Sequence, residues 1–387
     1  MPFTVTYPYL QYGGLWTTDQ AADARAQNKW PVPKYPALYS WGEGNFGVLG
    51  NGSTANTSSP SQVGSLTNWL NISSGTYHAL IVKTDGTLWA WGVNTDGQLG
   101  LGNRTNYSSP KQIGALNNWS IATGGLYHSV AIKTDGTLWA WGRSNVGQLG
   151  LGNITSYSSP VQVGSLTNWS KIACGSVFNI SIKTDGTLWS WGSGSNGRLG
   201  LGNTTAYSSP KQVGALTDWL NVSCGYQHVL AIKTNGTLWS WGGNANFGQL
   251  GLGNRTAYSS PKQVGSLTNW LSVSAGSYYS TSIKTDGTLW TWGNNENGAL
   301  GLGNITRYSS PKQVGSLTNW STVSAGWSQL TGAIKTDGTL WMWGQNVYGG
   351  LGLGNITYYS SPKQVGSLTN WSKVKVARNT TLATALI

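Results

Sequence analysis

A Trp-Gly dipeptide recurs seven times in this chain at almost constant spacing. A second tryptophan, preceded by Asn or Asp, follows each copy, and residues 38–387 hold seven units of about 50 residues. A repeat of this length is one structural unit that buries its apolar surface only against its neighbours. The sequence therefore predicts a repeat architecture rather than two or three independent domains. The tryptophans of the dipeptide are Trp41, Trp91, Trp141, Trp191, Trp241, Trp292 and Trp343.

Each unit has the pattern of four short strands. In the first complete unit, 68–75 is a short apolar stretch, 77–83 alternates as a second strand, and 87–92 is a third. Thr84-Asp85-Gly86 forms the tight turn between the last two, because glycine supplies a positive φ there. The fourth strand is expected at 111–114, after Pro110. No stretch has a helical period, so the units predict an all-β, seven-bladed propeller of four-stranded blades.

The chain begins and ends in the middle of a blade. The first Trp-Gly follows a third strand that has no second strand before it, and the chain ends with a first and a second strand. We expect residues 380–387 to pair beside 37–41, which closes the ring and hides sheet edges that favour aggregation. Residues 38–387 are thus predicted to form the propeller and 1–37 an extension outside it.

The tryptophans are predicted to form the core of this ring. Twenty of the 23 fall at three repeated positions of the unit. One buried tryptophan removes about 150–250 Å² from water, which is enough to hold thin neighbouring sheets together. We interpret them as core residues at blade-to-blade contacts and not as surfaces for a ligand.

The net charge of +12 is spread along the repeat. Lysines recur at the turn between the second and third strands and in the phrase Ser-Ser-Pro-Lys. This distribution predicts a diffuse positive rim, which does not favour nucleic-acid binding. No apolar run approaches the ~20 residues of a membrane helix, and the N-terminus lacks the pattern of a secretory signal. The turn lysines are Lys83, Lys133, Lys183, Lys233, Lys284 and Lys335.

The sequence offers little for catalysis. Five of the eleven acidic residues are the repeated turn aspartates, and the others are scattered over different blades. The three histidines, His78, His128 and His228, occupy one equivalent position of the repeat, which favours a structural role over a metal site. Cys174 and Cys224 are also equivalent and are expected to be small buried residues. We therefore predict no enzyme activity, no metal and no cofactor.

Two connections of each unit differ between the units. One follows the glycine that ends the first strand, and the other follows Trp-Gly; because strands alternate in direction, both are expected on one face. Aromatic and polar residues at these positions suit the binding of a sugar or a protein surface. The alternative is that the differences between units are sequence drift in unconstrained loops. The candidate binding residues of the first connection are Tyr77, Leu126, Tyr127, Tyr226, Gln227, Tyr278, Trp327 and Arg378, and those of the second are Phe46, Phe247 and Tyr348.

The segment from Gly75 to Gly102 resembles the regulator of chromosome condensation repeat family. It carries the pattern G.YH......DGTLW.WG....GQLG.G, and the spacing and order agree in all seven units. This resemblance implies a seven-bladed propeller with blades of about 50 residues. It also implies two alternative functions. One is guanine-nucleotide exchange on a small GTPase or chromatin binding, as in the namesake, and the other is inhibitor-like protein binding, as in a β-lactamase inhibitor.

The first 37 residues predict a short helix capped by Thr17 or Thr18 and ended before Pro31. The segment is similar to parts of virion proteins of tailed bacteriophages. We therefore predict a virion surface protein of a tail or capsid, attached to other virion subunits through Leu15, Trp16 and Trp30. Its variable face would bind a host surface glycan or protein, and a homo-oligomer is a further partner to be tested.

Overall fold

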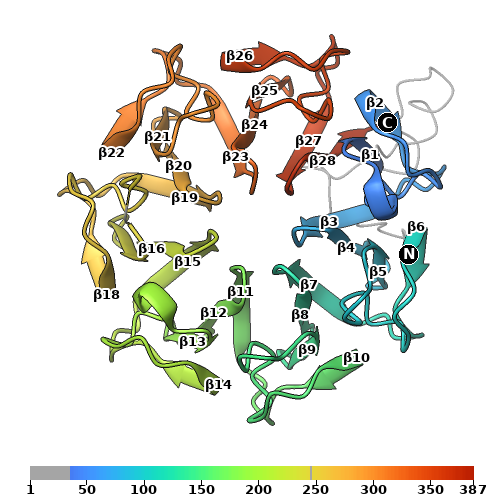
Figure 1. Ribbon diagram of the computed structural model, residues 1–387, viewed down its shortest axis with the longest axis vertical. Coiled ribbons are helices and arrows are strands. Elements are labelled where there is room, and N and C mark those ends of the chain that lie inside the picture. The colour runs from blue at the N-terminus through green and yellow to red at the C-terminus, as the bar shows by residue number, and fades with distance from the viewer. Residues whose placement is uncertain (1–34, 245) are drawn as a thin grey trace, which may run out of the picture. The chain divides into compact units, whose positions relative to one another are not determined.

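Seven four-stranded antiparallel sheets follow one another around a ring (Figure 1). The computed structural model describes residues 35–244 and 246–387, and Pro36–Ile387 forms one unit. The predicted all-β propeller with seven blades is therefore confirmed. The predicted helix and the anchoring residues Leu15, Trp16 and Trp30 lie outside the described residues.

Six blades are continuous in the sequence, with the first strand innermost and the fourth outermost. Blade 1 consists of β3 (Trp69–Ser74), β4 (His78–Lys83), β5 (Leu88–Gly92) and β6 (Tyr107–Gln112). Blade 2 consists of β7 (Trp119–Gly124), β8 (His128–Lys133), β9 (Leu138–Gly142) and β10 (Tyr157–Gln162). Blade 3 consists of β11 (Trp169–Cys174), β12 (Phe178–Lys183), β13 (Leu188–Gly192) and β14 (Tyr207–Gln212).

Blades 4 to 6 repeat this arrangement. Blade 4 consists of β15 (Trp219–Cys224), β16 (His228–Lys233), β17 (Leu238–Gly242) and β18 (Tyr258–Gln263). Blade 5 consists of β19 (Trp270–Ala275), β20 (Tyr279–Lys284), β21 (Leu289–Gly293) and β22 (Tyr308–Gln313). Blade 6 consists of β23 (Trp320–Ala325), β24 (Leu330–Lys335), β25 (Leu340–Gly344) and β26 (Tyr359–Gln364). The helical turns η1 (Asn45–Gly47) and η2 (Ser195–Gly197) follow the third strand of two blades.

The seventh, closing blade combines the two ends of the propeller. It consists of β27 (Trp371–Val376), β28 (Thr380–Leu386), β1 (Pro36–Gly42) and β2 (Thr57–Gln62), and β28 lies beside β1 (Figure 1). The pairing is antiparallel and continuous from Pro36 opposite Leu386 to Gly42 opposite Thr380. Closure of the ring by the terminal strands is therefore confirmed.

The hydrophobic core is divided into clusters that lie between adjacent blades. In one of them, Leu80 and Leu88 of blade 1 pack with Trp119 and Trp141 of blade 2. Each Trp-Gly indole also donates a hydrogen bond to a backbone carbonyl of the preceding blade, as Trp141 Nε1 does to Gln98 O at 2.9 Å. The same bond closes the ring, where Trp41 Nε1 lies 2.8 Å from Gly350 O. These tryptophans are core residues, as predicted.

The fourth strand begins earlier than the sequence predicted. In blade 1 it starts at Tyr107, opposite Gly92, and Pro110 lies within it. A proline lacks the amide donor, but the outermost strand of a sheet has one unpaired edge, where the loss costs little. A β-bulge between Ala90 and Gly92 accommodates the change of register. The prediction of a strand only after Pro110 was therefore wrong.

The turn lysines also differ from the prediction of a diffuse positive rim. Lys83 is buried, and its Nζ lies 3.8 Å from the ring centroid of Trp89 and 4.7 Å from that of Trp69. Trp89 itself is half-buried, with one side of its indole beneath the ammonium. All six turn lysines make this pair of cation–π contacts, so they stabilise the turn instead of forming an open charged surface. The corresponding contacts involve Lys133, Lys183, Lys233, Lys284 and Lys335.

The propeller has two faces of different construction. We call the constant face the one formed by the turns from the second to the third strand and by the links from each fourth strand to the next blade. These two parts contact each other, because Thr84 N donates to Asn68 O and Trp119 N donates to Gly86 O, both at 3.0 Å. The loop face is formed by the connections from the first to the second strand and from the third to the fourth.

Candidate functional site on the loop face

Both variable connections lie on the loop face and are bonded to each other in every blade. In blade 1, Val93 N donates to Tyr77 O at 2.9 Å, and in blade 2, Arg143 N donates to Tyr127 O at the same distance. The five other blades have the equivalent backbone bond. The prediction that the two variable sets share one face is therefore confirmed, while their role in binding is untested.

Two groups of aromatic side chains form on this face. The Tyr77 cluster comprises Tyr77, Tyr127, Arg143 and Arg378 at the junction of the closing blade and blades 1 and 2. The two tyrosine rings are stacked, with centroids 6.0 Å apart and an interplanar angle of 18°. The guanidinium of Arg143 lies 4.3 Å from the centroid of Tyr127, and that of Arg378 lies 5.2 Å from Tyr77. Arginine thus contacts both tyrosines of the pair.

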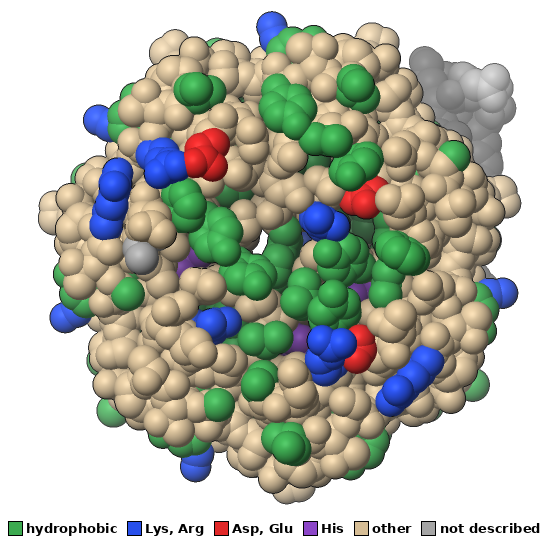
Figure 2. Space-filling model, in the orientation of Figure 1, with side chains coloured by type: hydrophobic (Ala, Val, Ile, Leu, Met, Phe, Trp, Pro, Cys, Tyr) green, Lys and Arg blue, Asp and Glu red, His purple; other side chains and the backbone are tan. Residues whose placement is uncertain are grey.

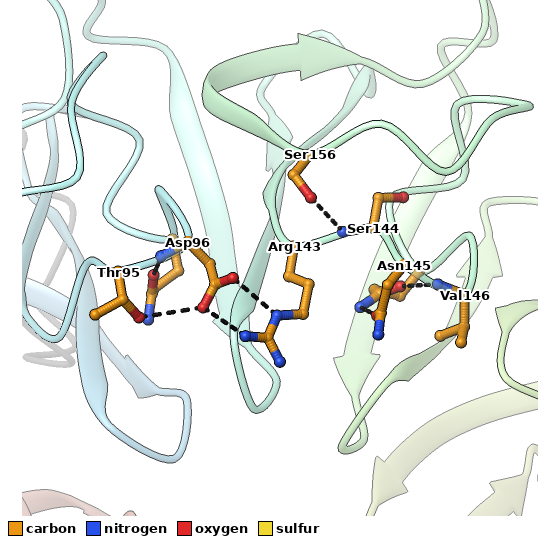
Figure 3. Close-up of polar contacts among 9 residues, drawn as sticks. Thr95, Asp96, Arg143, Ser144, Asn145, Val146 and Ser156 are labelled. Atoms are coloured by element: carbon orange, nitrogen blue, oxygen red, sulfur yellow. Dashed lines mark hydrogen bonds and ion pairs between the residues drawn. The ribbon is translucent and has the colours of Figure 1, made fainter.

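Arg143 is held in place by a carboxylate of the neighbouring blade. Its Nε lies 2.8 Å from Asp96 Oδ1 and its Nη2 lies 3.1 Å from Oδ2 (Figure 3). Thr95 Oγ1 donates a further bond to Asp96 at 3.1 Å, and Ser156 Oγ accepts one from Ser144 N. A two-point arginine–carboxylate pair fixes direction as well as distance. The Tyr77 cluster is therefore ordered by contacts between blades.

The second group, the Trp327 cluster, comprises Tyr226, Phe247, Tyr278 and Trp327 from blades 4 to 6. Tyr226 contacts Tyr278 with centroids 5.7 Å apart and Trp327 with centroids 5.8 Å apart, the latter edge to face at 85°. Phe247 extends the cluster to the third-to-fourth connection, 5.1 Å from Tyr278. Four of the predicted residues, separated by up to 101 positions in the sequence, are thus brought together.

Arg198 lies beneath the Trp327 cluster and is buried. Its Nε donates to Ser195 O at 2.7 Å and its Nη1 to Ser176 Oγ at 3.2 Å. Burial lowers the pKa of Arg198, and the nearby Tyr226 and Tyr278 oppose this effect. Among the described residues no carboxylate forms an ion pair with Arg198. A buried guanidinium held only by neutral acceptors leaves its positive charge without a compensating carboxylate close to this cluster.

Arg307 and Glu296 border the same cluster. They form an ion pair, and the guanidinium of Arg307 lies 4.9 Å from the ring centroid of Phe247. Glu43 of the closing blade accepts a 2.8 Å bond from Asn379 Nδ2. Together with Asp96, these are the carboxylates of the loop connections, and each is already engaged by a side chain of this chain.

The other predicted residues lie outside the two clusters. Gln227 Oε1 accepts a 2.9 Å bond from Asn196 Nδ2 of the preceding blade, and Leu126 N donates to Ser176 O. Phe46 is exposed and Tyr348 is half-buried, and neither makes an aromatic contact among the described residues. The candidate side chains are therefore not distributed evenly around the loop face. They form two aromatic clusters, with single side chains between them.

Backbone strain is also concentrated on the loop face. Four non-glycine residues have a positive φ within 35–244 and 246–387, and all belong to these connections: Phe46, Asn196, Asn246 and Gln329. Asn246 and Gln329 lie where blades 4 and 6 have their extra residue. Such conformations cost of order 1–3 kcal/mol each and persist where surrounding contacts or function require them.

Three arginines of the site were not among the predicted residues. Arg198 replaces the glutamine of the repeated Gln-Leu-Gly phrase, and this departure was the available signal. Arg307 precedes the Tyr-Ser-Ser phrase at a position where the units also differ. Arg143 follows Trp-Gly in a stretch that was recognised as variable. Their contacts with rings of other units could not be read from the repeat.

The histidines join neighbouring blades inside the ring. His78 Nε2 lies 2.9 Å from Ser129 Oγ, and His128 Nε2 lies 2.9 Å from Asn179 Oδ1. Burial lowers the pKa of His78 and of His228 to about 3 and that of His128 to about 4. The imidazoles are therefore neutral at physiological pH and structural, as expected.

The two cysteines are buried inside the propeller as well. Cys174 and Cys224 are buried free thiols, and burial raises their pKa well above the usual value. No group of three or more metal-binding side chains occurs within the described ranges. In the same part of the chain, no helix is long and apolar enough to cross a membrane.

The loop face is hollowed at its centre, where the ring leaves an opening (Figure 2). Hydrophobic side chains gather beside this opening, and basic side chains lie among them and farther out, with only a few acidic ones. This agrees with the two aromatic clusters and their arginines. An extended surface of this kind suits a macromolecular partner better than a small molecule, which prefers an enclosed pocket.

Comparison with known families agrees with the repeat. The model of the regulator of chromosome condensation (RCC1) repeat matches seven segments that together span most of the chain. A second model of the same repeat matches five segments between residues 69 and 299. The seven segments are 37–82, 85–132, 135–182, 185–232, 235–283, 286–331 and 337–384.

Solved structures with the same fold come from yeast and human. Prp20p of Saccharomyces cerevisiae, studied for its binding to Gsp1p and histones, has 20% identity and a TM-score of 0.81, covering 91% of this chain and 92% of its own. Human WBSCR16 has 20% identity and a TM-score of 0.81, covering 91% and 99%. The same yeast protein, RCC1 (Prp20), in a complex with Kap60 has 19% identity and a TM-score of 0.81, covering 99% and 96%. At this identity the likeness concerns the fold.

Proposed function

The chain belongs to the regulator of chromosome condensation (RCC1) repeat family, and we propose that it is a protein-binding propeller that recognises its partner with the loop face. The observation that carries the proposal is the pair of aromatic clusters on the loop face, each accompanied by arginine. Tyrosine, tryptophan and arginine contribute most of the binding energy in protein interfaces.

The packing of the aromatic rings favours a protein over a sugar. A sugar-binding platform needs an open ring face, but Arg143 covers Tyr127 and Arg378 covers Tyr77. In the Trp327 cluster the rings meet edge to face or at a tilt, so they form a compact apolar ridge. Such a ridge fits an apolar depression of a protein surface.

The electrostatics favour a partner with carboxylates. Glu43, Asp96 and Glu296 are engaged within the chain, whereas Arg198 has no carboxylate partner in the described ranges. A carboxylate of the partner, positioned beside Tyr226, would pair with this charge. The relatives add support at the level of the fold, since yeast Prp20p binds Gsp1p and histones and yeast RCC1 binds Kap60.

A capture experiment tests the proposal. The full chain is immobilised beside a variant with Tyr127→Ala, Tyr226→Ala and Trp327→Ala, and bound proteins are quantified by mass spectrometry. The matched control replaces three exposed isoleucines of the third-to-fourth connections, Ile154, Ile305 and Ile356, by alanine.

We expect proteins captured by the wild type and the control to be lost from the cluster variant, with the melting temperature lowered by only a few degrees. Capture should weaken at high salt, because charged pairs at the rim are screened. Equal capture by the cluster variant, or binding on a glycan array that depends on these three aromatic residues, would contradict the proposal.

The more specific functional predictions stay open to test. Guanine-nucleotide exchange predicts that the chain accelerates release of labelled GDP from a small GTPase, and inhibitor-like binding predicts capture of a secreted enzyme. The virion prediction depends on residues 1–37, of which 1–34 lie outside the described residues, and no described contact supports it. Mass spectrometry of purified phage particles tests it directly.

A further inference from the structure

The constant face displays a ring of exposed leucines. One leucine lies in the link before each first strand, and each exposes between 45% and 49% of its surface. Within the described residues, every leucine classed as exposed lies in one of these links or directly after the tryptophan that begins β15 or β19. The seven leucines of the ring are Leu66, Leu116, Leu166, Leu216, Leu267, Leu317 and Leu368.

Folding does not account for leucine at all seven positions. Other exposed positions differ between units, as Arg104, Ile154 and Thr204 do at one site of the third-to-fourth connection. A side chain that leaves almost half of its surface in water contributes little to the core. Regularly placed exposed apolar groups on one face instead mark an interaction surface.

The charge of this face identifies the kind of partner. In blades 1 to 6 the turns and links carry six lysines and six aspartates, so these parts of the constant face have no net charge. The remaining seventeen basic and five acidic residues account for the whole net charge of +12. Two copies of the chain would repel each other through most surfaces but not through this one.

The size of the face fits a dimer. Each of blades 1 to 6 contributes five or six exposed residues from its turn and link. A stable protein interface of standard size uses about 20–30 residues from each partner. The constant face therefore provides enough surface for a complete interface, and identical rings can meet around a two-fold axis.

We propose that the constant face binds a second copy of this chain, with the leucine ring at the centre of the contact. The two loop faces then point away from each other, and both stay available to partners. This inference does not depend on the function proposed for the loop face, because it uses different residues and a different measurement.

The mass of the full chain in solution tests the proposal. Sedimentation equilibrium of the wild type should give twice the 41.2 kDa of one chain. A variant with Leu116→Glu, Leu216→Glu and Leu317→Glu places six carboxylates in the contact, which should weaken dimerisation by about 100-fold or more. If this variant does not fold, the corresponding alanine variant is used, with a smaller shift in the same direction.

The control replaces Ile154, Ile305 and Ile356 by glutamate, since these side chains are more exposed than the leucines. It should stay dimeric, and so should the loop-face variant of Tyr127, Tyr226 and Trp327. Dimerisation should persist when the salt concentration is raised, because the interface is neutral. A monomeric wild type at about 100 µM, a dimeric leucine variant, or a monomeric isoleucine control would overturn the proposal.

Discussion

The two faces of the propeller are built by the same seven blades, yet the repeats differ far more on the loop face than on the constant face, where single positions such as Asp218 and Asn235 vary. On the constant face the backbone of the turn packs directly against the backbone of the link, so the turn glycine cannot be replaced without moving the link. On the loop face the backbone bond between the two connections persists whatever side chains they carry, as Val93 with Tyr77 and Arg143 with Tyr127 show. The difference teaches that residues vary between units where they can change without disturbing the packing of the blades. Exposure to solvent alone does not make a position variable.

Gly86 illustrates the constraint on the constant face. Its φ is +78°, and a Cβ at this position would lie 2.0 Å from Asn117 O in the link to the next blade. Any other residue would be strained by the conformation and would also collide with backbone. The Lys-Thr-Asp-Gly turn is therefore maintained by geometry, whereas Tyr77 or Trp327 can be replaced without moving the backbone.

The largest expected effect comes from removing the strand that both faces share. Deletion of residues 380–387 eliminates β28, which pairs with β1 on one side and with β27 on the other. The blade then loses its centre, and exposed sheet edges favour aggregation. We expect no cooperative melting by circular dichroism and aggregated material on size-exclusion chromatography. Deletion of Ile387 alone, which lies beyond β28, is the control and should melt like the wild type.

The next largest effect is expected at low pH, where residues near the two faces should lose stability in different pH ranges. His78, His128 and His228 follow the loop-face connections, and their folded pKa values of about 3 to 4 lie below the unfolded value of about 6.5. Below pH 6.5 the unfolded chain binds these protons and the folded chain does not, so stability is complete above this pH. The free energy of unfolding should fall by up to about 4 kcal/mol per pH unit between pH 6 and 4.

The constant face should respond only at lower pH. The hydroxyl and the amide of Thr137 lower the pKa of Asp135, so this turn loses stability as the pH falls below about 4. Urea unfolding at pH 7.5, 6.5, 5.5, 4.5 and 3.5 covers both ranges. His228→Phe copies Phe178 at the equivalent position and should reduce the slope above pH 4 by about one third. A flat profile from pH 7 to 5 would refute the assignment.

Most of the fold could be predicted because each unit repeats the same physical constraints. The Trp-Gly spacing, the Thr-Asp-Gly turn and the absence of helical period determined the number and order of strands. Incomplete strands at both ends of the propeller predicted the pairing of β1 with β28. The start of the fourth strand was wrong because a proline was treated as a boundary, although the outermost strand accepts one.

The candidate site could be predicted only in part. A repeat shows which residues occupy equivalent positions in different blades, but it does not show which side chains of different blades contact each other. Tyr226 and Trp327 were identified as variable, but their edge-to-face contact depends on side-chain directions in blades 4 and 6. Arg198 was overlooked since it occupies a buried position that holds glutamine in three of the other units. The leucine ring was overlooked for the opposite reason, because constancy of the link was attributed to the fold.

Two tryptophans near opposite ends of the inner strand β23 allow the stability contributions of the two faces to be compared directly. Trp320 begins β23 at the constant face, is buried, and contacts Trp341 and Trp343. Trp320→Ala should lower the free energy of unfolding by about 3–5 kcal/mol. Trp327→Ala at the loop face should lower it by only about 1 kcal/mol, since it loses the contact with Tyr226. Urea denaturation measures both, and equal losses would contradict the division between scaffold and binding face.

The smallest expected losses of stability come from replacing one basic side chain on each face, Lys183 on the constant face and Arg143 on the loop face. Lys183 is buried and its Nζ lies 3.7 Å from the ring centroid of Trp189, so Lys183→Ala should destabilise the chain by about 1–2 kcal/mol. Arg143 contacts Tyr127 but is more exposed, and its pair with Asp96 is screened, so Arg143→Ala should cost about 0.5 kcal/mol. Urea unfolding in 0.05 and 1 M salt separates them, because only the loss at Arg143 should shrink at high salt. A loss at Lys183 that depends on salt to the same extent would show that its ammonium is open to solvent, and the turn would then be no more constrained than the loop face.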